Sequence, residues 1–554
     1  MPSIYTPTTI WKNFVIDGEP SFISGGKTVI EGTVFESGYI EGRYVDGVRI
    51  KIYTRSAQQK EGKLPAVIIL NDFKYVEDDN LLTALAEKGY YAVMVDLAGK
   101  RDTSDNYTIY PEEIKYANLK YSSYEEKEIN DDITKTCYYE WCGVVKYVVE
   151  YLKSLPFITK IGAIGINGGA TALWHTLATS QDISCSVIVN NTGWRVYEGK
   201  NKFLSGAEEG YSDGKLAYTA GVEPQSYAKH VKCPTLILSC TNSNKYDCDR
   251  AYDTLTRIDE KIYKAIDYSV NRTVAIEKQT FNNALVFLDK FLQNKRYKLP
   301  KLIEISSQKE EKISVIVERE NLKALSLFVA EGQSESSKRS WKKYTDVLEQ
   351  GQAYEFSYKP SIQNGFISYF VKAEYKNGFE ICSRVCGKMI ETINAPEKKP
   401  NNILYTSREL LLDTQFASAN QEKIESAIDV LGQAQINVDV GPMKMLGLTG
   451  KGGVMTFNVC IDKIKNDTNA TLMFDAYLSN SGEIRVKLIA DYFGERIEYI
   501  ALAKIVAQGI WQNIKLEIYN FKTETGLTLK SYEDIEVVEF DAQEDYLINN
   551  VLWI

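Results

Sequence analysis

The segment Ile161-Gly-Ala-Ile-Gly-Ile-Asn-Gly-Gly-Ala170 constrains the fold of this chain more than any other. A short apolar strand at 160–166 leads through a few small residues into an apolar helix at 168–179. The glycines on either side of Asn167 allow a sharp turn and a close approach between strand and helix. The segment therefore predicts a strand–turn–helix unit that lifts the side chain of Asn167 above the edge of a sheet.

Length and composition indicate a soluble protein of several domains. The chain has 554 residues, of which 44% are hydrophobic and 25% are charged, so sizeable cores are expected. A net charge of −9 and a pI near 5.3 argue against nucleic acid or an anionic membrane as the main partner. The N-terminus shows no secretory signal, and no segment reaches the roughly 18 apolar residues of a membrane span.

The cysteine pattern favours a reducing compartment. Nine cysteines are an odd number, and they lack the paired spacing of a zinc site. Buried free thiols are expected, so the sequence predicts a cytoplasmic protein, or one exported by a route without an N-terminal signal. Neither a metal ion nor a cofactor is predicted.

Residues 1–298 show the alternation of an α/β domain. Asp46-Gly47 separates two alternating runs, which predicts a β-hairpin. Buried strands are predicted at 65–70, 90–97, 160–166, 185–190 and 234–240, and helices at 79–88, 137–153, 168–179 and 278–293. This order predicts a mainly parallel sheet with helices on both faces.

Two all-β domains are predicted after the α/β domain. Short alternating strands over residues 299–395 are typical of a small immunoglobulin-like β-sandwich. A polar, proline-containing linker follows at 397–402. Residues 400–554 then predict a second, jelly-roll-like β-sandwich.

Residues 30–295 resemble the α/β-hydrolase family, particularly its acetyl-xylan-esterase-like and peptidase-like branch. The resemblance rests on the helix at 141–152 leading into 160–172, on Val95-Asp-Leu-Ala-Gly-Lys-Arg-Asp and on Pro234-Thr-Leu-Ile-Leu-Ser-Cys-Thr-Asn. It implies a serine on the turn, a histidine that activates this serine, and a carboxylate that orients the histidine.

The three positions that the resemblance implies carry other residues here. Asn167 stands at the position of the serine, and Ser243 at that of the carboxylate, with Asp247 and Asp249 slightly further along. Arg272 stands at the position of the histidine. The resemblance therefore implies a degenerate triad of Asn167, Ser243 and Arg272.

The two histidines of the chain are not predicted to replace the missing base. His175 lies two turns into the helix after the turn, about 12 Å along its axis from Asn167. His230 precedes a strand, whereas active sites of open α/β sheets lie at the carboxyl edge. The sequence therefore predicts that the chain is not an enzyme. Asn71 and Asp72 follow a buried strand and, with Asn167 and Arg272, are candidate ligand-binding residues.

The last domain loosely resembles the jelly-roll carbohydrate-binding modules. Such modules bind sugars by stacking them on exposed aromatic rings, and Trp511 and Trp553 are the candidates for this role.

Three functions remain open at this point. The first is a catalytically inactive α/β-hydrolase-like protein acting as a structural, self-assembling or partner-binding subunit. The second is a carbohydrate-binding protein derived from a carbohydrate esterase, and the third is an esterase with unorthodox residues. A homo-oligomer is predicted, or an open polymer where the contact is head-to-tail, because 37 tyrosines suit interfaces. A glycan or another protein is the other expected partner. The tyrosines predicted at the surface include Tyr107, Tyr110, Tyr121, Tyr124 and Tyr211.

Overall fold

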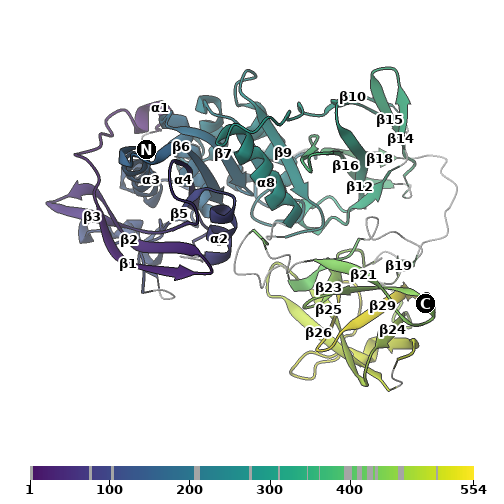
Figure 1. The fold of residues 1–554 in the computed structure, drawn as a ribbon. Helices are drawn as coiled ribbons and strands as arrows, with labels where there is room; N and C mark the ends of the chain where they lie inside the picture. Colours follow the sequence, from purple (N-terminus) through teal and green to yellow (C-terminus); the bar gives the residue numbers. More distant parts are fainter. Residues whose placement is uncertain are drawn as a thin grey trace.

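The computed structural model describes most of the chain. The described residues are 4–73, 78–101, 105–204, 212–273, 278–309, 312–345, 347–360, 362, 364–391, 402–407, 415–420, 428–430, 435–459, 464, 467–506 and 509–554. Figure 1 shows an α/β domain, followed by a first and a last β-domain.

Within these residues, nine strands form one main sheet in the order β1-β2-β3-β5-β4-β6-β7-β8-β9. The first three strands run antiparallel to their neighbours, whereas the strand pairs from β5 to β9 are parallel. The strands are β1 (Phe22–Ile30), β2 (Thr33–Val45), β3 (Val48–Gln58), β4 (Leu64–Leu70), β5 (Tyr91–Val95), β6 (Ile158–Ile166), β7 (Ile183–Val189), β8 (Thr235–Cys240) and β9 (Lys264–Ser269).

Helices cover both faces of the main sheet, as predicted. α3 (Cys137–Ser154) and α4 (Gly168–Thr179) pack on one face, and α2 (Asp79–Glu87) and α8 (Lys278–Phe291) on the other. The other α-helices described are α1 (Pro7–Ile10), α5 (Asp213–Gly221), α6 (Pro224–Tyr227) and α7 (Cys248–Thr256). These bounds agree with the predicted elements to within a few residues, because the buried strands are uninterrupted apolar runs.

The predicted hairpin is confirmed as the turn between β2 and β3. Val45 pairs with Val48 across it, and the two residues between them have positive φ angles, 47° at Asp46 and 85° at Gly47. Aspartate and glycine tolerate this backbone conformation, which matches the twist of the flanking strands.

The first β-domain consists of two antiparallel sheets. One has the order β10-β11-β15-β14, and the other β13-β12-β16-β17 with β18 also paired to β16. The strands are β10 (Glu304–Lys309), β11 (Lys312–Ile316), β12 (Leu322–Gly332), β13 (Lys342–Tyr344), β14 (Val347–Gln350), β15 (Ala353–Ser357), β16 (Asn364–Tyr375), β17 (Glu380–Cys382) and β18 (Cys386–Glu391).

The last β-domain is also a two-sheet sandwich. Its sheets have the orders β21-β22-β29-β24-β27, with β19 paired to β29, and β20-β23-β28-β25-β26. The strands are β19 (Ile403–Tyr405), β20 (Ala417–Ser418), β21 (Ile436–Val440), β22 (Leu446–Gly450), β23 (Val454–Thr456), β24 (Thr471–Leu478), β25 (Gly482–Ala490), β26 (Ile497–Ile505), β27 (Gln512–Glu517), β28 (Ile535–Ala542) and β29 (Tyr546–Trp553). The fold is therefore an α/β domain followed by two all-β domains, as the sequence predicts.

The α/β domain and the first β-domain share their cores. Tyr268 of β9 packs against Phe370 of β16, with 5.1 Å between the ring centroids. Lys372 of β16 is half-buried between the carboxylates of Asp267 and Glu380, at 2.9 and 2.6 Å. Burial opposes the charge on Lys372, but the two carboxylates outweigh it and raise the pKa of the ammonium group.

A buried ion pair fixes the segment that joins β12 to β13. The guanidinium of Arg339 is fully buried and donates to both oxygens of Asp249 on α7, at 2.6 and 2.8 Å. A third bond, to the carbonyl oxygen of Ser334, measures 2.8 Å. The N–H groups of the planar guanidinium point in fixed directions, so their hydrogen bonds hold this segment against the α/β domain in one orientation.

Two further observations concern the whole chain. None of the helices in the described ranges is long and apolar enough to cross a membrane. The cysteines of the described part are free thiols, and all are buried except Cys386, which is half-buried.

Replacing Arg339 should strongly destabilise the protein. In Arg339→Met the carboxylate of Asp249 stays buried without its cation, so we expect the free energy of unfolding to fall by about 3–5 kcal/mol. Urea denaturation followed by circular dichroism measures this change. The control is Lys323→Ala, which removes an exposed ion pair with Glu374 in the same domain and should leave the midpoint unchanged. Equal midpoints for Arg339→Met and the wild type would contradict the assigned role.

Candidate functional site

The turn after β6 places Asn167 at the carboxyl edge of the main sheet. Its backbone has φ 48° and ψ −112°, a strained conformation of the kind that marks functional turns. A Cβ atom at Gly168 would lie 2.3 Å from the ring of Phe73, and one at Gly169 would lie 2.2 Å from the carbonyl oxygen of Leu70. The two glycines are therefore required by close packing, and the predicted strand–turn–helix unit is confirmed.

The side-chain amide of Asn167 is held between two neighbours. Its Nδ2 donates to Oδ2 of Asp72 at 2.9 Å, and its Oδ1 accepts from Nδ2 of Asn190 at 2.9 Å. Nδ2 of Asn191 donates to the carbonyl oxygen of Asn167 at 3.0 Å. Asn167 is 6% exposed, so these bonds replace most of its contact with water.

Asp72 borders a cluster of phenols at the same edge. It is half-buried, and, in addition to burial, its charge raises the pKa of the neighbouring Tyr124 and Tyr246. Burial raises the pKa of Tyr124 to about 12, although Arg195 lowers it, and raises that of Tyr246 well above its usual value. Both phenols are therefore protonated at neutral pH and can donate hydrogen bonds. Asn71 is buried beside Asp72, and its Oδ1 accepts from the backbone N–H of Asp72 at 2.9 Å.

The surface tyrosines predicted from the sequence need correction at this cluster. Tyr124 is 9% and Tyr110 is 7% exposed, because both lie in the apolar core on the α3 side of the sheet. Tyr121 is exposed as predicted, Tyr107 is half-buried, and Tyr211 lies outside the described residues.

The loop after β8 binds the first β-domain. Ser243 is buried, and its hydroxyl accepts from the backbone N–H groups of Lys245 and Tyr246 at 3.2 and 3.1 Å. The neighbouring Asn242 donates from Nδ2 to the carbonyl oxygens of Ser337 and Arg339, at 2.9 and 2.6 Å. The hydroxyl of Ser243 thus makes hydrogen bonds within the loop, whereas the amide of Asn242 joins the loop to the β12–β13 segment.

The loop after β9 binds the same segment. Asn271 has φ 56°. Its Oδ1 accepts from the backbone N–H of Trp341 at 2.9 Å, and its Nδ2 donates to the carbonyl oxygen of Trp341 at 3.0 Å. Arg272 is 4% exposed, and its carbonyl oxygen accepts from the backbone N–H of Asn242 at 2.9 Å. Arg272 and Ser243 therefore lie in two neighbouring loops, and a peptide segment of the first β-domain covers these loops.

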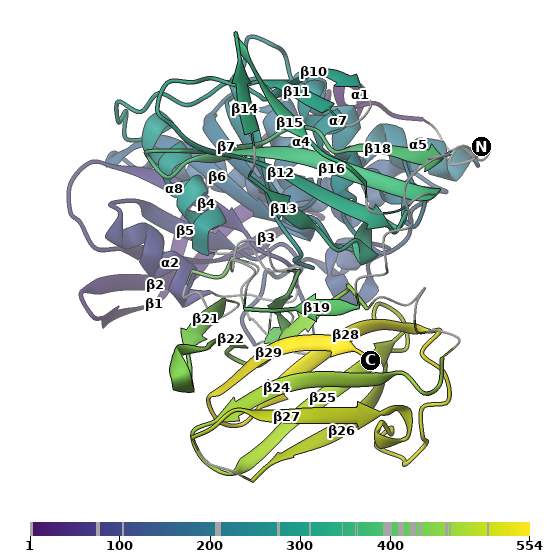
Figure 2. The ribbon, with the colours of Figure 1, turned by 90° about the vertical axis from the view of Figure 1, so that its right-hand side faces the viewer.

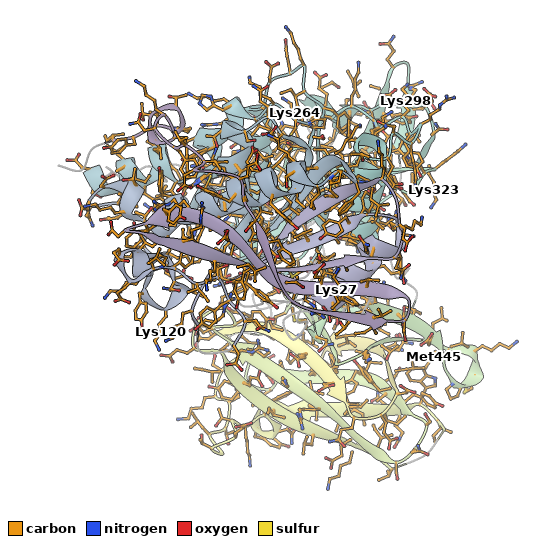
Figure 3. All side chains as sticks on the ribbon, turned by 60° about the vertical axis from the view of Figure 1, so that its left-hand side comes forward. Lys27, Lys120, Lys264, Lys298, Lys323 and Met445 are labelled. Carbon is orange, nitrogen blue, oxygen red and sulfur yellow. The ribbon has the colours of Figure 1, made fainter. Side chains whose placement is uncertain are left out.

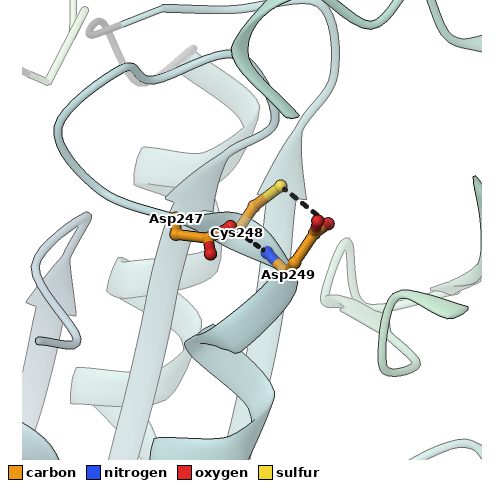
Figure 4. A group of neighbouring side chains, drawn as sticks. All are labelled: Asp247, Cys248 and Asp249. Carbon is orange, nitrogen blue, oxygen red and sulfur yellow. Dashed lines mark hydrogen bonds between the residues drawn. The ribbon is translucent and has the colours of Figure 1, made fainter. Parts of the chain in front are cut away.

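Asp247, Cys248 and Asp249 form a compact group at the start of α7 (Figure 4). Both carboxylates already have cationic partners, Arg339 at Asp249 and Arg250 at Asp247. Burial and the charge of Asp249 raise the pKa of Asp247 to about 6, although Arg250 lowers it. Burial also raises the pKa of Cys248 well above its usual value. Each of the two carboxylates therefore holds one arginine.

His175 packs against Val222 and Tyr227. Its Nε2 lies 2.8 Å from the carbonyl oxygen of Val222, and its ring stacks on Tyr227 with 4.0 Å between centroids. His230 is half-buried and precedes the start of β8, away from the carboxyl edge. Neither histidine belongs to the cluster around Asn167.

The last β-domain carries a row of aromatic and polar side chains on the outward face of its β21–β27 sheet. Tyr477 of β24 and Trp511, just before β27, are half-exposed, with 5.8 Å between their ring centroids. Two residues before Tyr477 on β24, and therefore on the same face, Asp475 accepts hydrogen bonds from Asn513 at 2.9 Å and from Asn550 at 2.7 Å. The strands β29, β24 and β27 run side by side in the lower part of Figure 2.

The two tryptophans proposed for sugar stacking have different environments. Trp511 is half-exposed, whereas Trp553 is 1% exposed, donates to the carbonyl oxygen of Val459 at 3.1 Å and packs on Tyr532. The prediction for Trp553 is therefore wrong, because its side chain points into the sandwich core. The sequence reasoning missed Tyr477 and Asp475, although their alternation with buried Phe474 and Ala476 marks them as outward-facing.

The matches of this chain among known proteins are remote solved structures. No family model and no curated protein matches the chain. Among solved structures, an acetyl xylan esterase from Paenibacillus sp. R4 is 10% identical, with a TM-score of 0.40 over 52% of this chain and 92% of that one. Acetyl xylan esterase 1 from Thermoanaerobacterium is 14% identical, with a TM-score of 0.33 over 46% and 81% of the two chains. The Pyrococcus horikoshii acylaminoacyl peptidase is also 14% identical, with a TM-score of 0.33 over 51% of each chain.

The fold and the prediction on enzymatic activity stand differently. The mainly parallel sheet with helices on both faces, followed by two antiparallel β-domains, is the architecture that the sequence resemblance implies. The prediction that the chain is not an enzyme is contradicted, because the solved structures that match are esterases and a peptidase. At 10–15% identity and TM-scores of 0.40 or less, the likeness assigns no reaction to this chain.

Converting Asn167 to aspartate should destabilise the turn. Asn167→Asp keeps the volume and the bond from Asn190, but it removes the donor to Asp72 and places two carboxylates side by side. We expect a loss of about 1–3 kcal/mol in the free energy of unfolding at pH 7. Urea denaturation measures it, with the exposed Asn437→Asp as the matched control. If Asn167→Asp were as stable as Asn437→Asp, the result would contradict the hydrogen-bond network assigned to Asn167.

His175 should make stability depend on pH. Burial lowers the pKa of His175 to about 4, although the bond to Val222 raises it, whereas in the unfolded chain it is about 6.5. Below pH 6.5 the unfolded state therefore binds a proton that the folded state excludes, and stability is lost progressively down to pH 4. We expect this group to contribute a loss of up to about 3 kcal/mol.

Nuclear magnetic resonance can test this titration directly, because the chain has only two histidines. His230→Gln assigns the signals, and His175→Gln should flatten the stability profile between pH 6.5 and 4. A signal of His175 that titrates near pH 6.5 in the folded protein would refute the assignment.

Proposed function

We propose that the chain binds carbohydrate through the outward face of β24, β27 and β29 in its last β-domain. The observation that carries the proposal is the aromatic pair Tyr477 and Trp511 beside the hydrogen-bonded row Asn513, Asp475 and Asn550. Apolar ring faces next to oriented amides and a carboxylate match the two surfaces of a sugar, its C–H face and its hydroxyl groups.

The aromatic part of this face is held rigidly. The indole Nε1 of Trp511 donates to the carbonyl oxygen of Pro442 at 3.2 Å. A Cβ atom at Gly441 or Gly447 would lie 2.8 or 2.7 Å from the indole ring, so the ring lies against bare backbone. A ring fixed in this way loses little conformational freedom when a sugar stacks on it.

The polar part is oriented by its own hydrogen bonds. Asp475 accepts one amide N–H from each side, which fixes the side chains of Asn513 and Asn550 across three neighbouring strands. Side chains two residues apart along a strand are about 7 Å apart, so one ligand can contact both Asp475 and Tyr477. Because the whole chain has a net charge of −9, neutral glycans are favoured over anionic ones.

A reducing compartment is part of the proposal. The cysteines in the described part of the chain are free thiols, and burial raises the pKa of residues such as Cys185 and Cys240. Free buried thiols are usual where glutathione keeps cysteines reduced, which supports a cytoplasmic location.

Removing either ring should weaken glycan binding. We expect Trp511→Ala and Tyr477→Ala to raise the dissociation constant by about tenfold or more, since stacking on a rigid ring is worth about 1–3 kcal/mol. A glycan array identifies the neutral oligosaccharide, and titration calorimetry with that oligosaccharide measures the change.

The matched control is Tyr519→Ala, which removes an exposed tyrosine that follows β27 but lies outside the proposed face. Binding that falls equally in the control, or that persists unchanged in both ring variants, would refute the face. The absence of any array signal for the full chain would refute the function.

A further inference from the structure

The two edge strands of the main sheet, β9 and β1, have different surroundings. At one edge, β17 packs beside β9, where Sγ of Cys382 donates to Oδ1 of Asp267 at 3.2 Å. Asn283 of α8 holds β17 in place by two hydrogen bonds to the backbone of Glu380, at 2.7 and 2.9 Å. At the opposite edge, no strand of the described residues pairs with the outer side of β1.

β1 is long and carries little charge for an exposed edge. It has nine residues, of which all except Phe22 are exposed, and Ile23, Val29 and Ile30 are 49%, 69% and 52% exposed. Its only charged residue is Lys27, which lies 3.3 Å from Glu36 of β2 (Figure 3). Edge strands of this kind present unpaired backbone groups that favour pairing with another strand.

The pairing of β1 with β2 defines which side chains share a face. After the irregularity at Gly25, Lys27 lies opposite Glu36 and Val29 opposite Val34, while Thr28 lies opposite Phe35. Lys27 and Val29 therefore point to one face of the sheet, and Gly26, Thr28 and Ile30 to the other. An antiparallel partner strand must match these faces residue by residue.

A second copy of β1 satisfies this requirement in one favourable register. With the two-fold axis at Thr28, each Lys27 faces Val29 of the other copy, each Gly26 faces Ile30, and the two Thr28 residues face each other. An axis at Lys27 would place two ammonium groups opposite each other, and an axis at Val29 would pair only residues 28–30. Threonine opposite threonine is a favourable cross-strand pair.

We propose that two copies of the chain associate through antiparallel pairing of residues 26–30 of β1, with the two-fold axis at Thr28. The main sheets of the two copies then form one continuous sheet. Because the same strand serves both copies, the contact is closed after two copies and does not propagate into a polymer. This inference is independent of glycan binding, which uses the last β-domain.

In this register, a charge introduced at the exposed position 29 should change the dimer dissociation constant. Val29→Glu places a carboxylate opposite Lys27 of the other copy twice per dimer, so the dimer dissociation constant should fall severalfold at low salt. This gain should vanish at about 1 M salt, where the Debye length is about 3 Å. Val29→Lys places two ammonium groups opposite each other and should leave only monomer.

Sedimentation velocity over micromolar to near-millimolar concentration measures both effects, with circular dichroism confirming the fold. The control is Val48→Lys on β3, which adds the same charge at a residue that is 55% exposed and away from β1. Wild-type protein that stays monomeric throughout, or a dimer that Val29→Lys leaves intact, would overturn the proposal.

A crosslink tests the axis itself. Thr28→Cys should give a disulfide-linked dimer on mild oxidation, because the two residues at the axis lie directly opposite each other. Their Cβ atoms are about 4.5 Å apart in the closer kind of cross-strand pair, which approaches the separation that a disulfide needs. Ser24→Cys, on the same strand before the irregularity, should not crosslink. The reverse pattern, or efficient crosslinking at both positions, would overturn the register.

Discussion

The buried ion pair between Arg339 and Asp249 is the interaction on which the arrangement of the first two domains depends. A charge removed from water needs its partner at a fixed distance, so the segment between β12 and β13 has one allowed position on α7. This position brings the backbone at Ser337 and Trp341 within reach of the loops after β8 and β9. The first β-domain thus becomes part of the carboxyl edge of the main sheet.

Asparagine side chains complete that edge. An amide donates and accepts at once and carries no charge, so it can be buried between other polar groups at a lower cost than a carboxylate or an ammonium group. Asn167 joins β4 to β7 in this way, and Asn242 and Asn271 join β8 and β9 to the β12–β13 segment. The strained backbone at Asn167 is held in place by these bonds and by the close packing of the glycines after it.

Much of the α/β domain could be predicted from the sequence because its elements carry local signals. β4 is a continuous apolar run, and Asp46-Gly47 fits a tight hairpin. The contact of Asn271 with Trp341 could not be predicted, since it joins residues 70 positions apart and depends on how two domains dock. Trp511 and Trp553 look alike in sequence, but only their positions on the pleat decide which ring faces solvent. Tyr124 was misplaced for a similar reason: polar neighbours in the sequence conceal a ring that packs against Phe73 and Trp141.

The side-by-side packing of β9 and β17 has a consequence for the time course of synthesis. The bond between Asp267 and Cys382 spans 115 residues. At a translation rate of about 5–20 residues per second, Asp267 leaves the ribosome roughly 6–23 seconds before Cys382 does. During that interval β9 and the apolar surface around Tyr268 are made but not yet covered. A nascent chain of this length therefore presents an open sheet edge, and chaperones that bind exposed apolar segments have their main opportunity on this protein before β17 is synthesised.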